Sequence, residues 1–576
     1  MKKFYKLLED KLLNAITKSG YNVEKVVVTE SNRPDLGDYQ FNGIMPLAKI
    51  YHKNPVEIAN DVVNLLKNDD FFKDVNVAGP GFINMAISDK ALIDFININD
   101  YEYTKNDKLI FFDYGGANVA KALHVGHLRS TNIGESLKRL VEYLGYNTIS
   151  DTHLGDFGRP LGLVILELSK RYPDWKYFDK NYNDSYPDVE ITTSLLEEIY
   201  PYASLKAKEN EEYLKEAQEM TFRLQNHEKG IYDLWKKIME VSKTDIKKIY
   251  KRLNATFDLY RGESDAEEIV PELLSYLDKL NIVYESNGAK VIDVAKEDDK
   301  LEIPPMLLIK SDGGILYSTT EMATIYDRIK SYHPEELWYI VDKRQDLHFT
   351  QVFRACKKAN IVSENTNLVF AGFGTMNGKD GKPFKTRDGG VMRLNDLLEL
   401  VKKECLAKLN ENIVVNRDEI AEKIAISAVK FADLLPNRES DYIFDIEKFC
   451  DLEGKTGPYI LYSTIRMKSL LNKANEKSIK YDRISKIANE FDRNIILLLN
   501  NLDIVLNNAF NSKSLHEITD YLYKLTTSYN RFYSECHILT EKDLEKQKSW
   551  LYLTKIVYDV NNILLNILAI EVPEKM

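Results

Sequence analysis

The sequence predicts an α/β protein of three domains, with a doubly wound parallel sheet in the middle of the chain. A chain of 576 residues is too long for one hydrophobic core. Between about residues 106 and 415, short apolar runs typical of buried strands alternate with segments of helical period. From about residue 416 the period is helical, with no convincing strand. We therefore expect a small α/β domain at 1–105, the parallel sheet at 106–415 and an all-α domain at 416–576.

The first domain is predicted from its local signals. The opening "MKKFYKLLEDKLLNAI" repeats apolar residues at helical spacing and carries two acids, as an amphipathic helix does and a signal peptide does not. A strand is expected at 25–30 and a helix at 54–67. A second strand is expected at 81–88, after the turn Gly79-Pro80-Gly81.

The central domain begins with "DKLIFFDYGG" (107–116), which suits a buried parallel strand ending at Asp113. The next helix has an apolar stripe from Leu128 to Leu144, and Gly145 stands where a C′ glycine belongs. Residues about 190–256 are charged and helical in period, which predicts a helical insertion. Further strands are expected at 147–150, 304–310, 314–318, 337–342 and 367–373.

Composition restricts the classes of function. Hydrophobic residues make up 44% and charged residues 29%, as in soluble globular proteins, and no apolar run approaches the roughly 18 residues of a membrane span. The four cysteines are scattered without a CxxC pair, which disfavours zinc sites and disulfides and favours a reducing cytoplasm. The net charge of −11 argues mildly against a polyanionic partner, although binding nucleic acid requires only a local basic face.

The segment "YGGANVAKALHVGHLRS" (114–130) carries the clearest chemical signal. It places His124, Gly126 and His127 between a strand and a helix, where doubly wound sheets bind ligands. Gly126 lets a base or phosphate chain approach the backbone, and a helix N-terminus attracts anions. Two imidazoles on one face can donate hydrogen bonds to charge developing on a phosphate. The segment predicts a nucleotide site; the alternative is two helix-capping histidines.

A second cluster, "GKDGKPFKTRDGG" (378–390), sets four cations among glycines. Such a loop can close on a triphosphate, and it is not a Walker A loop because it lacks GxxxxGK[ST]. A solvated surface loop is the alternative. Lys121, three residues before His124, could neutralise a phosphate, or could be an ordinary loop lysine. The cations of the cluster are Lys379, Lys382, Lys385 and Arg387.

Together these motifs resemble those of the class I aminoacyl-tRNA synthetases, and in detail those of the arginyl-tRNA synthetase family. "HVGH" resembles the HIGH signature and "PFKTRDGG" a divergent KMSKS loop. "NVAKALHVGHLRSTNIGESLKRL" with "HLGDFGRPLG" resembles the family's active-site block, and "GDYQFNGIMPLAK" its N-terminal domain. "AVKFADLLPNRESDYIFD", "LEGKTGPYILYSTIR" and "IEVPEKM" resemble its helical anticodon-binding domain and C-terminal end.

The resemblance implies a Rossmann-like catalytic domain and a two-step reaction. Arginine attacks the α-phosphate of ATP, which carries Mg²⁺, and the arginyl group then passes to the terminal adenosine of tRNA(Arg). The motif match assigns His124 and His127 to the α-phosphate and Gly126 to the adenine. Thr386 stands where the KMSKS form has its second lysine, so Lys121 would supply that charge. Lys382 and Lys385 would contact ATP, with Lys385 and Arg387 supporting catalysis.

The resemblance also implies three further sets of contact residues. Asp113, Tyr317 and Glu321 match the positions that read the guanidinium group, with Glu321 standing where the family has Asp. Asn118 and Gln345 match positions that hold the α-amino group. Tyr39, Gln40 and Asn42 would lie near the tRNA elbow, unless they form an ordinary half-buried turn.

Two other readings stay open on the sequence. Small nucleotidylyltransferases also use HxGH on such a sheet, but they need neither an N-terminal appendage nor a long helical domain. A non-catalytic paralogue would keep tRNA binding alone, although the intact His124, Gly126, His127 and Lys121 argue against it. The expected partners are tRNA(Arg), L-arginine and ATP, with no DNA, membrane or zinc. A cytoplasmic monomer is expected.

Overall fold

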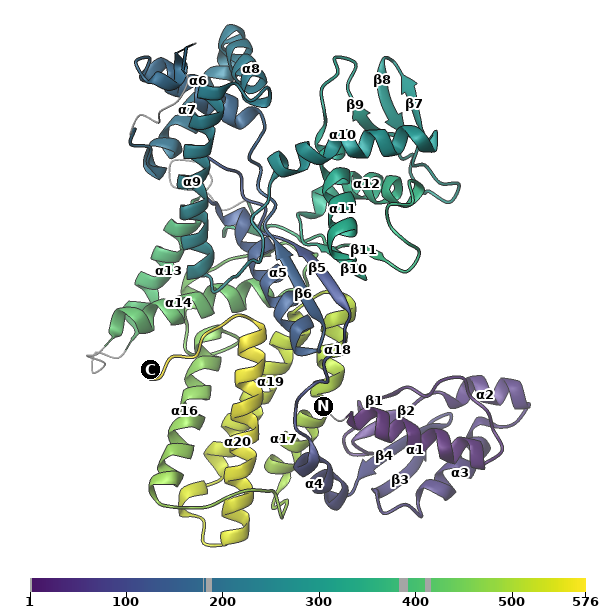
Figure 1. Ribbon diagram of the computed structural model, residues 1–576. Helices are drawn as coiled ribbons and strands as arrows, with labels where there is room; N and C mark the ends of the chain where they lie inside the picture. Colours follow the sequence, from purple (N-terminus) through teal and green to yellow (C-terminus); the bar gives the residue numbers. More distant parts are fainter. Residues whose placement is uncertain (1–2, 180, 183–188, 383–391, 410–415, 576) are drawn as a thin grey trace.

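The computed structural model describes residues 3–179, 181–182, 189–382, 392–409 and 416–575 (Figure 1). Its N-terminal unit is a four-stranded antiparallel sheet in the order β1-β2-β4-β3, covered by helices. The strands are β1 (Val28–Glu30), β2 (Tyr39–Phe41), β3 (Phe72–Ala78) and β4 (Phe82–Ile87). The helices are α1 (Phe4–Lys18), α2 (Ile44–Tyr51), α3 (Pro55–Leu66) and α4 (Asp89–Ile98).

In this unit, the helix and the strands with clear capping or turn residues in the sequence form where they were predicted. The helix predicted at 54–67 is confirmed as α3, since Asn54 accepts a hydrogen bond from the Val56 N–H and Pro55 occupies the first turn. The strands predicted at 25–30 and 81–88 are confirmed as β1 and β4. No strong local signal in the sequence marks β2 or β3, whose pairing with β4 is a non-local interaction.

The central sheet is parallel, in the order β11-β10-β5-β6. β5 is Leu109–Asp113, β6 is Asn147–Asp151, β10 is Glu336–Tyr339 and β11 is Asn367–Phe370. The chain moves from β5 outward to β6 and later returns to β10 on the other side of β5. The strand order therefore reverses between β5 and β10, and such a reversal opens a crevice at the carboxyl ends of the two strands.

Helix α5 (Val125–Tyr143) connects β5 to β6 and ends as predicted, with Gly145 at φ 95°. It is buried on more sides than an amphipathic stripe requires, because polar residues are buried as well. The Arg129 guanidinium donates to Asp433 on α14 (Arg417–Leu434) at 3.1 Å and to the Gly374 carbonyl at 2.7 Å. These bonds fix α5 against the C-terminal helices.

One strand prediction in the central region is wrong, and a second is right about the strand but wrong about its sheet. Residues 314–318 form no strand: Ile315 makes one isolated bridge to Ile309, and α11 (Tyr317–Tyr332) begins there. Residues 304–310 do contain a strand, β9 (Met306–Ile309), but it belongs to a separate antiparallel sheet with β7 (Val283–Ser286) and β8 (Ala289–Ile292). The turn Asn287-Gly288, with φ 52° and 77°, is a hairpin signal that could have revealed this sheet.

The predicted insertion is confirmed as helical and projects from the central domain (Figure 1). It is formed by α7 (Thr193–Glu209), α8 (Glu211–Gln225) and α9 (Lys229–Arg252), with α6 (Arg159–Arg171) and the short η1 (Lys176–Phe178) before it. Three helices and a short turn complete the central region: α10 (Glu263–Leu280), α12 (Asp346–Lys358), α13 (Leu394–Lys408) and η2 (Lys343–Gln345).

The C-terminal region is a helical bundle, with one exception to the predicted absence of strands. β13 (Tyr442–Ile443) pairs in parallel with β12 (Met376–Asn377) of the central domain. The helices after α14 are α15 (Ile446–Phe449), α16 (Gly457–Glu476), α17 (Glu490–Asn500), α18 (Leu502–Ser512), α19 (His516–Glu535) and α20 (Leu544–Ile567), with η3 (Ile538–Thr540) before the last. No helix among the described residues is long and apolar enough to cross a membrane.

Candidate active site

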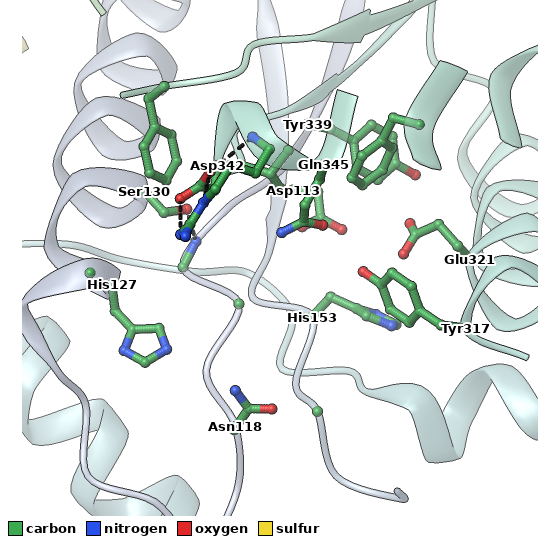
Figure 2. Close-up of a pocket in the computed structure, with 18 of the residues that line it drawn as sticks. Asp113, Asn118, His127, Ser130, His153, Tyr317, Glu321, Tyr339, Asp342 and Gln345 are labelled. Carbon is green, nitrogen blue, oxygen red and sulfur yellow. Dashed lines mark hydrogen bonds and ion pairs between the residues drawn. The ribbon is translucent and has the colours of Figure 1, made fainter. Parts of the chain in front are cut away.

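A pocket of about 450 Å³ lies at the carboxyl ends of β5 and β10, where the strand order reverses (Figure 2). Residues far apart in the sequence meet there, because β5 delivers the loop before α5 while β10 delivers the residues around η2. The predicted residues that line this pocket are Asp113, Asn118, His124, Gly126, His127, Tyr317, Glu321 and Gln345. The Ser130 hydroxyl joins both sides, since it accepts from the Gly115 N–H (2.8 Å) and donates to the Ile340 carbonyl (2.7 Å).

The two histidines form the N-terminal cap of α5. The Gly126 N–H donates to His124 Nδ1 (3.0 Å), and the His124 N–H donates to His127 Nδ1 (3.1 Å). The rings lie 3.9 Å apart. A Cβ on Gly126 would stand 2.7 Å from the His124 ring, so this capping geometry itself requires glycine.

Burial keeps both rings neutral, and the cap determines which ring nitrogen carries the proton. Burial, with the charge of Lys121, lowers the pKa of His124; burial, with His124 beside it, lowers the pKa of His127 to about 3. Both imidazoles are therefore neutral near pH 7. Because each Nδ1 accepts a backbone N–H, the ring proton is on Nε2. Capping and chemistry are compatible: two fixed Nε2–H donors are available for an anionic ligand.

Buried acids occupy the other end of the pocket. Asp113 is held by Arg328, whose guanidinium lies 2.7 Å from its carboxylate and also donates to Asp151 (2.8 Å) and Tyr339 (3.0 Å). Glu321 is 2% exposed, and its Oε1 has no hydrogen-bond partner among the described residues. Burial, with the charge of Asp113, raises the pKa of Glu321. Glu321 is thus the acid with free capacity for a cationic ligand.

Of the predicted phosphate-binding cations, the two that the structure describes, Lys121 and Lys382, do not line the pocket. The Lys121 ammonium lies 4.2 Å from the centre of the Tyr200 ring, which α7 supplies. Lys382 is exposed in a tight turn, in which the Gly378 N–H donates to its carbonyl. Lys385 and Arg387, like Thr386, lie outside the described residues.

The three predicted tRNA-contacting residues of the N-terminal unit differ in their exposure to solvent. Tyr39 is 1% exposed and packs between Phe4 and Tyr5, with its hydroxyl 3.5 Å from Asn501 of the helical bundle. A ring so enclosed offers no face on which a base could stack, and the contact of Tyr39 with the tRNA elbow stays a prediction. The Gln40 amide donates to Asn84, whereas Asn42 is exposed.

Sequence patterns did not predict several residues that line the pocket, among them His153 and Glu263. His153 lies in "HLGDFG", after β6, and Glu263 starts α10. Burial raises the pKa of Glu263. The general rule that ligands contact the carboxyl ends of strands could have identified His153, which stands two residues after the end of β6. Glu263 carries no comparable signal, since its position depends on how α10 returns to the sheet.

Comparison with known proteins identifies the family. Residues 92–446 match the family model described as "tRNA synthetases class I (R), catalytic domain", which covers more than half of the chain. The chain belongs to the arginyl-tRNA synthetase family. Residues 6–87 match the arginyl-tRNA synthetase N-terminal domain, and 460–576 match the DALR anticodon-binding domain.

Known arginine–tRNA ligases are similar to this chain over nearly its full length, in sequence and in fold. An arginine–tRNA ligase of Alkaliphilus oremlandii is 45% identical over 572 residues, 97% of each chain. One from Agathobacter rectalis is 42% identical and is covered completely. The crystal structure of the Plasmodium falciparum arginyl-tRNA synthetase superposes with a TM-score of 0.82 at 25% identity, covering all of both chains. The Thermus thermophilus enzyme, at 20% identity and a TM-score of 0.78, shares the fold.

Proposed function

We propose that this chain is an arginine–tRNA ligase, which activates L-arginine with ATP and transfers it to the 3′ adenosine of tRNA(Arg). One observation carries the proposal: a single crevice holds neutral histidine donors at one end and a buried acid with an unpaired oxygen at the other, in a chain related over its full length to arginine–tRNA ligases. The first end suits a phosphate and the second a guanidinium group.

The charges that line the pocket would set the orientation of the substrates in it. The Nε2–H groups of His124 and His127 would donate to the α-phosphate as its charge develops, when the arginine carboxylate attacks and pyrophosphate departs. Glu321, with the Tyr317 hydroxyl directed toward it in Figure 2, would receive the guanidinium group. Gln345 lies between these ends in Figure 2, and Gln345 and Asn118 would hold the α-amino group. Glu263 adds a second acid at the guanidinium end.

Asp113 takes a different part from the one its position in the motif implies. Asp113 already forms an ion pair with Arg328. A substrate cation would therefore share the Asp113 carboxylate with Arg328. Lys121 would have to leave the Tyr200 ring to reach a phosphate. Lys382, Lys385 and Arg387 are proposed to close on the triphosphate.

ATP arrives with its own Mg²⁺ in this scheme. No group of three or more His, Cys, Asp or Glu side chains in the described parts of the chain could hold a metal ion. The triphosphate oxygens are hard ligands that suit Mg²⁺. The chain's own contribution is the pair of histidine donors and the loop cations.

We propose the three domains at 1–105, 106–415 and 416–576 as elbow-contacting, catalytic and anticodon-binding units. In the first, exposed Asn42 and the half-buried Gln40 are the candidates for tRNA contact. The four cysteines are free and buried, which supports a reducing cytoplasm. A monomer is proposed on family grounds.

ATP–pyrophosphate exchange tests the function and separates the alternatives. Exchange that requires arginine and tRNA(Arg) is expected. Exchange driven by another amino acid, or by arginine without tRNA, would count against the proposal. Nucleotidyl transfer without an amino acid would indicate a nucleotidylyltransferase, and tRNA binding without any exchange would indicate a non-catalytic paralogue.

A further inference from the structure

A second cavity of about 180 Å³ lies next to the candidate active site. Its lining includes three acids, Asp265, Glu268 and Asp327, and two arginines, Arg261 and Arg328. Among the residues that line the two cavities, His153 is the one they share. Its imidazole is therefore part of the wall between the substrate pocket and this second space.

The fold holds the His153 ring by packing and not by hydrogen bonds. The side chain is 9% exposed, and neither ring nitrogen has a hydrogen-bond partner in the described structure. A buried polar group without a partner is costly, and its presence in a folded protein calls for a functional explanation such as a bound ligand. The pocket gives that ligand a place, since the ring extends toward Tyr317 at the end where Glu321 lies (Figure 2).

The remainder of the wall is rigid. Arg328 lines the second cavity, and it is fixed by Asp113, Asp151 and the Tyr339 hydroxyl. This network anchors the ends of three parallel strands, so it cannot be removed without disturbing the sheet. His153 has no such bonds and is the part of the wall that a substitution can open.

We propose that His153 sets the length of the amino-acid side chain that this pocket accepts. The inference rests on the proposed function, in which the arginine side chain runs from the histidine pair toward Glu321. The imidazole stops the guanidinium group at that depth and offers it a ring nitrogen as an acceptor. Behind it, Asp327 is already paired with Arg261, and a guanidinium group placed one methylene deeper would meet the carboxylates of Asp265 and Glu268.

The test compares arginine with homoarginine, which has one more methylene, as substrates in ATP–pyrophosphate exchange. One methylene in a fitted pocket usually changes kcat/KM by about 10- to 200-fold. His153→Ala removes the wall, and His153→Asn shortens it while keeping a polar group. We expect both to shift the ratio of kcat/KM values toward homoarginine by about 10-fold or more. Either variant alone suffices if the other fails to fold.

His153→Phe separates depth from hydrogen bonding. Its ring keeps the wall but has no acceptor, so it should weaken arginine while preserving the preference over homoarginine. His227→Ala is the matched control, because it truncates an exposed histidine of the same domain that lines neither cavity. Calorimetric binding of both amino acids gives a second measurement, and thermal unfolding establishes that each variant is folded.

The outcomes are distinct. If the unmodified protein fails to activate arginine, the proposed function is wrong. If it activates arginine but a folded His153→Ala or His153→Asn keeps the original ratio, or loses both substrates equally, His153 does not set the depth. A loss of discrimination in His153→Phe would overturn the inference as well, since that variant retains the wall.

Discussion

Replacing Glu321 with Gln tests the guanidinium site most directly. The carboxylate is buried on α11 with one oxygen unpaired, and its pKa is raised by burial and by the charge of Asp113. Gln keeps the volume and removes the charge. Breaking a buried ion pair costs about 3–5 kcal/mol, and the remaining acids moderate this loss, so kcat/KM for arginine should fall by about 10²- to 10⁴-fold.

The same substitution should leave the free protein as stable or more stable. An acid whose pKa is raised on folding contributes stability at low pH, and this contribution is lost as the pH rises from its ordinary value, 4.5, through the raised pKa. Glu321→Gln removes that penalty at neutral pH. Lower activity with equal or higher stability is therefore the expected signature, and it excludes simple misfolding as the cause.

The assay is arginine-dependent ATP–pyrophosphate exchange at saturating ATP and tRNA(Arg), with urea unfolding of each variant. Glu321→Asp is the control, since it keeps the charge and restores the family's residue, and it should retain much of the activity. If Glu321→Gln stays within about threefold of the unmodified protein, far below the cost of breaking a buried ion pair, Glu321 is not the guanidinium partner. Asp113 would then be the better candidate despite its pair with Arg328.

Three further outcomes are expected. Asp113→Asn should also abolish arginine activation, but with lower stability in urea, because it removes a partner from the buried Arg328. His127→Ala should slow adenylate formation by about 10²- to 10³-fold with the KM for ATP nearly unchanged, and a change in that KM alone would refute the role of its Nε2–H. Because the pKa of His127 is about 3, its protonation should not limit the rate between pH 6 and 8. Lys430→Met should be more stable than the unmodified protein at pH 7: burial lowers the Lys430 pKa to about 7, and its Nζ has no hydrogen-bond partner among the described residues. The unfolded chain binds the proton more tightly between pH 7 and 10.5, so stability should rise with pH across that window only in the unmodified protein. Equal urea midpoints for the two proteins at pH 7 would contradict this account.

The sequence by itself determined the elements whose signals are local. The apolar run 109–112 with its terminal Asp113, the cap of α5 and Gly145 after it depend on residues within one or two turns of each other. The histidine motif is of the same kind: His124, Gly126 and His127 complete their geometry within four residues. Identifying the family was possible because these short patterns recur together along the chain.

The tertiary structure alone decided which groups remain free to act. Arg328 lies 215 residues beyond Asp113, yet it pairs with the Asp113 carboxylate, whereas Glu321 keeps an unpaired carboxylate oxygen. Tyr39 became part of an interface because Asn501, 462 residues away, packs over it. Strand β9 pairs with β8 of the β7-β8 hairpin, although its apolar composition would fit the parallel sheet equally well. Local periodicity records which face of an element is apolar, but burial of a charge or a ring depends on partners that only the packing of distant segments supplies.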